Sequence, residues 1–331
     1  MSDLRQKAWP KVTVVIVNWN GERFLERCLA ALMAQTVKPH EILLVDNASS
    51  DASVGIVRRF PFVRLMALNQ NTGFARGNNL AIKEVTVESK WVALINPDAF
   101  PEPDWLERLI NAANNNPEYS FFASRQLIDG DHNLLDGEGD AYHISGLVWR
   151  VGHGQPKVGA SHELREIFSP CAAAAMYRLD ALKSVGGFDE DFFCYVEDVD
   201  LGFHLRLMGH RCLLVPDAVA HHIGSATTGG QQSDFSVYHG HRNLVWAYVK
   251  NMPGWLFWAC LPLHIAMNLA AVLVFMWRGK GLVILKAKRD ALLGLPKMWH
   301  KRQEIQINRV ATVCEIWRVL DKRLFPIKQG R

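Results

Sequence analysis

The feature that most constrains the fold is an apolar run ending in polar residues, Val92-Ala-Leu-Ile-Asn-Pro-Asp98. Residues 12–17 (Val-Thr-Val-Val-Ile-Val) form a similar, β-branched run. Such runs are typical of strands buried on both faces of a sheet. Because open α/β sheets bind ligands outside the carboxyl ends of their strands, Asn96 and Asp98 are placed for chemistry.

Strands and helices alternate along the first 116 residues. The expected strands are 12–17, 41–45, 63–68 and 91–95. The expected helices are 22–35 and 73–84. This order predicts an α/β fold with a mostly parallel central sheet flanked by helices. No GxGxxG motif follows the first strand, which disfavours a dinucleotide-binding domain.

The apolar periodicity is weaker after residue 125. Residues 126–168 are rich in Gly and His and predict an insertion or a mobile flap. We expect helices from about residue 179 and over 198–208, the second closed by Gly209. A further strand is expected at 212–215.

Charge is distributed unevenly along the chain. Residues 278–331 hold 14 Lys/Arg against 4 Asp/Glu, a net +10, whereas the rest is net −6. A basic tail on an acidic body indicates an anionic partner, either a membrane or nucleic acid. No nucleic-acid-binding module is recognisable, so nucleic acid is not expected as a partner. The six cysteines form no CxxC pair and residues 1–10 contain no apolar signal core, which favours a cytoplasmic protein with reduced thiols.

Several residues that follow the predicted strands have two readings. Asp46 suits a contact to a nucleoside, but it also suits a cap for the next helix. Trp19 can stack on a base or belong to the core. Asn96 and Asp98 offer the oxygen ligands that Mg²⁺ or Mn²⁺ takes, although Asn-Pro-Asp is also a common turn.

A second acidic cluster, Glu197-Asp198-Val199-Asp200, begins a predicted helix. The amino end of a helix stabilises an ionised Asp198, which can then accept a proton; helix capping is the alternative, for Asp200 above all. His222 can complete a metal shell or contact a phosphate, but a structural role, or His221 in its place, stays open. One carboxylate to hold a metal and another to take a proton are the parts that metal-assisted group transfer needs.

Six motifs occur in a fixed order along the chain. They are Val17-Asn-Trp-Asn-Gly21, Val45-Asp-Asn-Ala-Ser-Ser-Asp51, Asn71-Thr-Gly-Phe-Ala-Arg-Gly-Asn-Asn79, Asn96-Pro-Asp98, Gly186-Gly-Phe-Asp-Glu190 and Tyr195-Val-Glu-Asp-Val-Asp200. In this order they resemble the inverting family 2 glycosyltransferases, and above all the rhamnosyltransferase-like branch, over about residues 11–250. The resemblance implies a GT-A fold, a nucleotide-diphosphate sugar donor and a divalent metal, Mg²⁺ or Mn²⁺. It also implies a catalytic domain at 1–250, with a donor half at about 11–125 and an acceptor half at about 126–250.

The resemblance implies roles for individual residues. Asp198 is expected to be the catalytic base, and Asp98 and His222 the metal ligands. Donor contacts are expected from Asn18, Trp19, Asp46, Arg76 and Asn96. The acceptor side is expected to include Gly187, Phe188, Asp189, Glu190 and Glu197. Two positions depart from the pattern: Asn96 replaces the first acid of the DxD motif, and His204 stands where this branch often has Arg, with Arg206 nearby.

The implied reaction is an inverting transfer of a sugar to a hydroxyl group. The favoured donor is dTDP-rhamnose, from which L-rhamnose is transferred. The alternative is transfer of galactofuranose or a hexose. A catalytically inactive membrane scaffold is a rival, which the joint presence of Asp46, Asp98, Asp198 and His222 argues against. A nucleotidyltransferase is disfavoured because no Gly-rich loop with a basic residue follows the first strand.

Residues 254–277 contain no Asp, Glu, Lys or Arg, and as a helix they are roughly 36 Å long, enough to cross a bilayer. Trp255, Trp258 and Trp277 resemble an interfacial aromatic belt, whereas Pro262, His264 and Asn268 interrupt the segment. A single crossing would export the basic tail, against the positive-inside rule.

We therefore expect residues 251–331 to form a monotopic or re-entrant helical region on the cytoplasmic face of the cell membrane. The basic run 281–302 would lie on anionic lipid. A soluble helical subdomain is the alternative. A transferase lying on the membrane indicates a lipid-linked acceptor. The resemblance to the rhamnosyltransferase-like branch implies that this acceptor is a polyprenyl-diphosphate glycan in the assembly of a bacterial surface polysaccharide.

Overall fold

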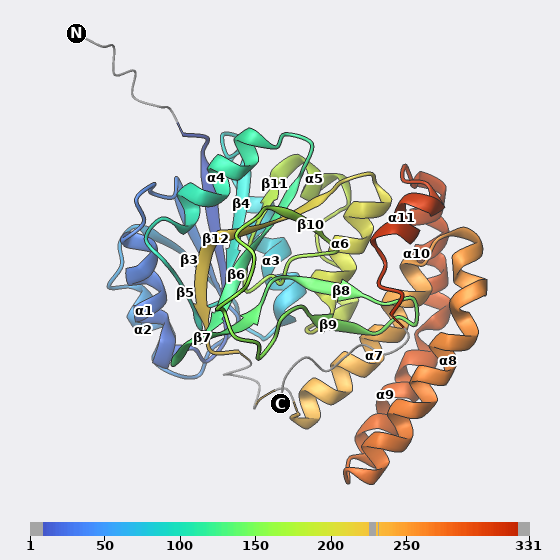
Figure 1. Cartoon of the computed structure of the whole chain (residues 1–331). Coiled ribbons are helices and arrows are strands. Elements are labelled where there is room, and N and C mark those ends of the chain that lie inside the picture. Colours follow the sequence, from blue (N-terminus) through green and yellow to red (C-terminus); the bar gives the residue numbers. More distant parts are fainter. Residues whose placement is uncertain (1–8, 225–229, 231, 324–331) are drawn as a thin grey trace.

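The computed structural model describes residues 9–224, 230 and 232–323 (Figure 1). The prediction of no apolar leader at residues 1–10 therefore lies outside the described residues, apart from Trp9 and Pro10. Residues 324–331 of the basic segment also lie outside them.

Residues 12–95 form four parallel strands with helices between them. The elements are β1 (Val12–Asn18), α1 (Glu22–Met33), β2 (Glu41–Asp46), α2 (Ser53–Val57), β3 (Val63–Ala67), α3 (Gly73–Glu84) and β4 (Trp91–Ile95). β1 pairs with β2 and β4, and β2 pairs with β3, all in parallel. The predicted strands are confirmed, and their carboxyl ends share one edge of the sheet.

Residues 99–222 complete the sheet. They are β5 (Ala99–Pro101), α4 (Trp105–Asn115), β6 (Phe121–Ile128), β7 (Asp131–Gly137), β8 (Asp140–Tyr142), β9 (Val148–Arg150), β10 (Arg165–Ile167), β11 (Ala174–Arg178), α5 (Leu179–Ser184), the 3₁₀ turn η1 (Glu190–Phe192), α6 (Glu197–Leu207) and β12 (Cys212–His222). Over the described residues, one ten-stranded sheet has the order β10-β12-β6-β11-β4-β1-β2-β3, with β5 on β12 and β7 on β6. β8 and β9 form a separate hairpin.

The segment 126–168, expected to be an insertion or a mobile flap, contains four strands, β7 to β10. Strands β8, β9 and β10 have three residues each, too few to show a period of two. β7 is also irregular, since its register with β6 shifts twice. Weak periodicity here reflects short, irregular strands.

Strand β12 runs seven residues beyond its predicted end at residue 215. Pro216 has no N–H for the ladder, and the register with β6 shifts between Val215 and Val219. Beyond the shift, β12 pairs with β5, so that His222 lies opposite Ala99. This pairing brings His222 beside Asp98, more than a hundred residues away in sequence.

Alternate residues of the central strands pack into two separate cores. Val14 and Ile16 of β1 share a cluster with buried residues of α1 and α4. Val15 and Val17 share the other cluster with residues of α3, α5 and α6. Burial on both faces explains why these strands read as continuous apolar runs.

Five helices follow the sheet: α7 (Asp234–Asn251), α8 (Gly254–Trp277), α9 (Gly281–Leu293), α10 (Leu295–Asn308) and α11 (Val313–Val319). They gather on the side of the molecule beyond α6, and α8 and α9 lie side by side (Figure 1). α8 is long and apolar enough to cross a membrane, and only 11% of its most apolar window is buried. Pro262, His264 and Asn268 do not break this helix. His264 Nδ1 donates to Ser145 O (2.7 Å), which ties α8 to the loop between β8 and β9.

Candidate active site

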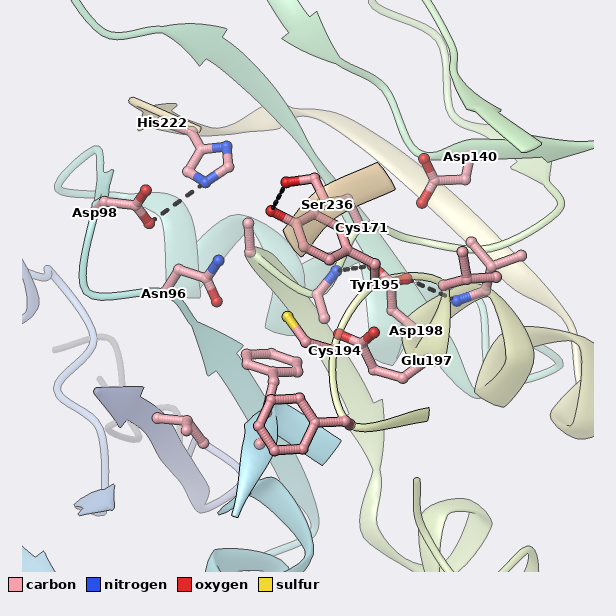
Figure 2. A pocket seen from close by; sticks show the side chains of 18 of the residues that line it. Asn96, Asp98, Asp140, Cys171, Cys194, Tyr195, Glu197, Asp198, His222 and Ser236 are labelled. Carbon is pink, nitrogen blue, oxygen red and sulfur yellow. Dashed lines mark hydrogen bonds and ion pairs between the residues drawn. The ribbon is translucent and has the colours of Figure 1, made fainter. Parts of the chain in front are cut away.

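A cavity of about 700 Å³ lies at the carboxyl ends of β1 and β4. Asp98, Asp198 and His222, remote from one another in sequence, all line it. Asp98 and His222 lie on one side, and Asp140 and Asp198 lie on the other (Figure 2). The end of β12 and the amino end of α6 therefore converge on the carboxyl edge of the parallel strands.

Backbone strain is concentrated around this cavity. Among the described residues, the non-glycine positions with positive φ are Asn20, Ala48, Phe193, Tyr195 and Val196, with φ between 51° and 68°. The first two follow the ends of β1 and β2, and the other three lead into α6. Such conformations cost about 1–3 kcal/mol each and cluster at functional sites.

The residues expected to bind the sugar donor differ in how deeply they are buried. Trp19 is 37% exposed and lines the cavity, as does Asn96. Asn18 and Asp46 are buried beneath it: Asn18 Nδ2 donates to Asp46 Oδ1 (2.9 Å), and Asp46 Oδ2 accepts from Ser49 N (3.0 Å). These contacts hold the two strand ends together.

Arg76 of α3 lies outside the cavity lining. Its Nε is 3.8 Å from Glu190 Oε2, and both side chains are partly exposed.

The metal side of the cavity is built around His222. Its Nδ1 donates to Asp136 Oδ2 (2.8 Å), and its Nε2 is 3.5 Å from Asp98 Oδ1. Burial acts to lower the pKa of His222, but the carboxylates of Asp98 and Asp136 outweigh it and raise this pKa to about 9. The buried Nε2 has no hydrogen-bond partner among the described residues. His221 instead points to Glu102 (3.2 Å), so His222 is the residue that faces the site.

A divalent cation needs ligand atoms that are not already used in hydrogen bonds. His222 Nε2 and Asn96 Oδ1 are both buried and without a hydrogen-bond partner in the described part of the chain, and a cation would displace the proton of Nε2. Asp136 orients His222 from behind, as carboxylates do for metal-bound imidazoles. No group of three or more His, Cys, Asp or Glu in the described ranges is arranged to hold a metal by itself. The set therefore fits a cation that also takes oxygens from a bound diphosphate.

Asp198 lies in the first turn of α6. Its Oδ2 accepts from Ala172 N (3.1 Å) and its Oδ1 from Val199 N (2.8 Å). Burial raises the pKa of Asp198 from its ordinary value, while these backbone donors act against the rise. Burial raises the pKa of Glu197 further, and its Oε2 has no hydrogen-bond partner in the described residues. Two carboxyl groups of different proton affinity thus face one cavity.

The other expected acceptor-side residues lie elsewhere. Gly187, Phe188, Asp189 and Glu190 line a second cavity of about 410 Å³, and the first cavity does not include them. Asp189 pairs there with Lys250 Nζ (2.8 Å) and with Lys301.

His204 also lines the second cavity, whereas Arg206 is buried and donates to Phe168 O (2.6 Å). Neither residue lines the first cavity.

The polar residues of the site that were not predicted from the sequence include Asp136, Asp140 and Arg150. Arg150 donates to Asp136 and to Cys171 Sγ (2.8 Å), which links the two sides of the cavity. The segment Asp136-Gly-Glu-Gly-Asp140 offered a signal, because its acids alternate with glycines. These residues were not predicted because their positions depend on the pairing of short strands across a loop.

Comparison with known proteins agrees with this geometry. The profile of Glycosyl transferase family 2 matches residues 13–186. N-acetylglucosaminyl-diphospho-decaprenol L-rhamnosyltransferase from Mycobacterium tuberculosis (strain CDC 1551 / Oshkosh) is 30% identical over 251 residues, which are 68% of this chain and 80% of that protein. O-antigen biosynthesis protein RfbC from Myxococcus xanthus is 28% identical over 66% of this chain, which spans only 18% of that protein.

Two solved structures share the fold. Mannosyltransferase PcManGT from Pyrobaculum calidifontis, in complex with GDP-Man and Mn²⁺, superposes with a TM-score of 0.54 at 20% identity, over 94% of this chain and 88% of that one. GalNAc-T7 with UDP, GalNAc and Mn²⁺ gives a TM-score of 0.59 at 15% identity, over 74% of this chain and 48% of that one. The chain belongs to glycosyl transferase family 2: it is a glycosyltransferase with a GT-A-like fold and resembles a rhamnosyltransferase.

Proposed function

We propose that this enzyme transfers L-rhamnose from dTDP-rhamnose, with inversion, to a hydroxyl of a lipid-linked glycan in the assembly of a bacterial surface polysaccharide. The observation that carries the proposal is that Asp98, Asp198 and His222 line one cavity at the carboxyl edge of the parallel strands. The sugar and the acceptor are proposed from the relative with 30% identity, whose name specifies an L-rhamnosyltransferase acting on N-acetylglucosaminyl-diphospho-decaprenol.

The residues of the cavity have different roles in the proposed inverting transfer. Asp198 removes the proton of the acceptor hydroxyl as that oxygen attacks the anomeric carbon. The diphosphate leaves from the opposite face, so one base suffices. Because burial raises the pKa of Asp198, this carboxylate is a better proton acceptor than an exposed Asp. Trp19 and the strand-end loops carrying Asn18 and Asp46 would bind the nucleoside.

Asp98 and His222, with Asn96, would hold a Mg²⁺ or Mn²⁺ ion. Such an ion supplies charge neutralisation at the departing diphosphate. Asp136 keeps His222 oriented toward it through the 2.8 Å hydrogen bond.

The C-terminal helices support a monotopic or re-entrant association with the cytoplasmic face of the membrane. If α8 alone crossed the bilayer, α9 and α10 would lie on the far side. However, Lys301 of α10 pairs with Asp189 and Asp191, and Trp246 Nε1 of α7 donates to Ala291 O of α9 (3.0 Å). These contacts support an arrangement in which both flanks of α8 stay with the catalytic domain. The proposed division is a catalytic domain (1–250) and a membrane-associating region (251–331).

The test is a transfer assay with the full chain, Mg²⁺ or Mn²⁺, a panel of nucleotide sugars and N-acetylglucosaminyl-diphospho-farnesol as the acceptor. We expect transfer from dTDP-rhamnose, with a product whose anomeric configuration, measured by NMR, is opposite to that of the donor. Transfer from another nucleotide sugar would favour the galactofuranosyl or hexosyl alternative. No turnover of any donor would favour an inactive scaffold.

A further inference from the structure

The hairpin of β8 and β9 forms the wall of the cavity on the side away from Asp98 and His222 (Figure 2). Asp140 of β8 lies directly opposite Arg150 of β9 in the antiparallel register, and both residues line the cavity. Neither the family motifs nor the proposed chemistry gives Asp140 a role.

The carboxyl group of Asp140 is unusually placed. The residue is only 7% exposed, yet its carboxyl points into the cavity and no hydrogen bond from the described residues reaches it. Its neighbour Arg150 is engaged elsewhere, by Asp136 and by Cys171 Sγ. A largely buried residue whose carboxyl group opens into the cavity is placed to exchange a hydrogen bond with a ligand hydroxyl.

The surrounding charge indicates which ligand fits. Burial, with the charge of Asp198, raises the pKa of Asp140 to about 8 against the opposing effect of Arg150, which favours the neutral acid. A neutral carboxylic acid both donates and accepts a hydrogen bond, as a sugar hydroxyl does. A phosphate is a poor fit, because Glu197 and Asp198 face the same end of the cavity.

We propose that Asp140 binds a hydroxyl of the acceptor sugar other than the hydroxyl that attacks, and so selects the acceptor and orients it toward Asp198. This inference rests on the proposed transferase function and names a specificity residue for it. Asp198 would take the proton of one hydroxyl while Asp140 holds another on the same ring. The acceptor subsite would then be made by the β8–β9 hairpin, in addition to the Glu197 side of the cavity.

The test combines one substitution with a set of acceptor analogues. Asp140→Leu keeps the branched shape of the side chain but has no hydrogen-bonding atom, and the analogues are monodeoxy forms of N-acetylglucosaminyl-diphospho-farnesol, each lacking one hydroxyl. We expect wild-type kcat/KM to fall at least about tenfold with one analogue that still reacts. Asp140→Leu should show a similar fall with the complete acceptor and no further fall with that analogue. Asp131→Leu, at an exposed acid of the preceding strand β7, is the matched control and should behave as wild type.

Donor hydrolysis without acceptor separates this inference from the proposed function. Near-UV circular dichroism should show that Asp140→Leu is folded, and the control Asp131→Leu should hydrolyse the donor at the wild-type rate. If the variant loses activity equally with every analogue, Asp140 only supports the fold of the wall and the inference is wrong. If wild-type enzyme turns over no donor at all, the transferase proposal fails first and the inference falls with it.

Discussion

Asp198 and Asp200 are two residues apart on α6 and have different environments. Asp198 faces the cavity and is held by the backbone N–H groups of Ala172 and Val199. Asp200 is buried and bound to Lys250 and to Asn251 Nδ2 (2.6 Å). Of these two carboxylates, Asp198 is therefore the one placed to exchange a proton with a substrate.

Replacing Asp198 by Asn should remove turnover and leave the donor bound. The amide keeps the size of the side chain but cannot take the hydroxyl proton, so kcat should fall by roughly 10²–10⁴. The measurement is kcat for transfer together with the donor Kd from calorimetry. Asp217→Asn, on an exposed position of β12, is the control. Full activity in Asp198→Asn would move the base to another residue.

Replacing Asp136 by Asn should weaken cation binding without touching a proposed ligand. Asp136 holds Nδ1 of His222, and loss of such a partner costs about 10–100-fold in metal affinity. The Kd for Mn²⁺, measured by electron paramagnetic resonance in the presence of dTDP, reports this directly. An unchanged Kd would show that His222 does not contact the cation.

At the scale of elements, the second cavity is held by buried ion pairs. Lys250 of α7 pairs with Asp189 ahead of η1 and with Asp200 of α6, and its side chain is only 3% exposed. Lys297 of α10 pairs with Asp191, but its side chain is 63% exposed. These contacts join the C-terminal helices to the catalytic domain.

Lys250→Met should destabilise the protein far more than Lys297→Met. The first change leaves the buried carboxylate of Asp200 without a counter-charge, at roughly 3–5 kcal/mol, whereas Asp189 keeps Lys301. The second removes an exposed pair worth about 0–1 kcal/mol. Urea unfolding followed by near-UV circular dichroism compares the two free energies of unfolding. Equal losses would mean that burial does not set the strength of these pairs.

The elements that could be predicted are those with local signals. β1 and β4 are buried on both faces, so their apolar runs alone identify them. β8 and β9 could not be identified, because three-residue strands show no period and their pairing depends on the tertiary fold. The same difference applies to the site: Asp98 and Asp198 follow from ordered motifs, whereas Asp136 and Asp140 lie in the irregular segment.

At the scale of the whole molecule, the outer face of α8 is apolar and uncovered. Ile265, Leu269, Leu273 and Trp277 recur every four residues and are 50%, 61%, 68% and 88% exposed. Such a stripe on a helix fixed to a catalytic domain with basic neighbours matches a surface that lies in the membrane interface.

Leu269→Glu with Leu273→Glu should release the full chain from vesicles of anionic lipid. Two charges on the stripe should lower the partition coefficient by roughly tenfold or more, because ionised side chains are costly in the apolar layer. Co-sedimentation with phosphatidylglycerol vesicles measures this coefficient. Val87→Glu, at a 93% exposed position of the catalytic domain, is the control. Equal binding of all three proteins would make α8 a face for another protein or for a second copy.

The central claim is that Asp98, Asp198 and His222 act on one bound nucleotide-diphosphate sugar. A crystal structure with Mn²⁺ and a non-hydrolysable dTDP-rhamnose analogue tests it most directly. The account predicts that Asp98 and His222 contact the ion at about 2.0–2.3 Å and that Asp198 lies across the sugar from the diphosphate. A diphosphate bound away from His222, or Asp198 on the same side of the sugar as the leaving group, would contradict it.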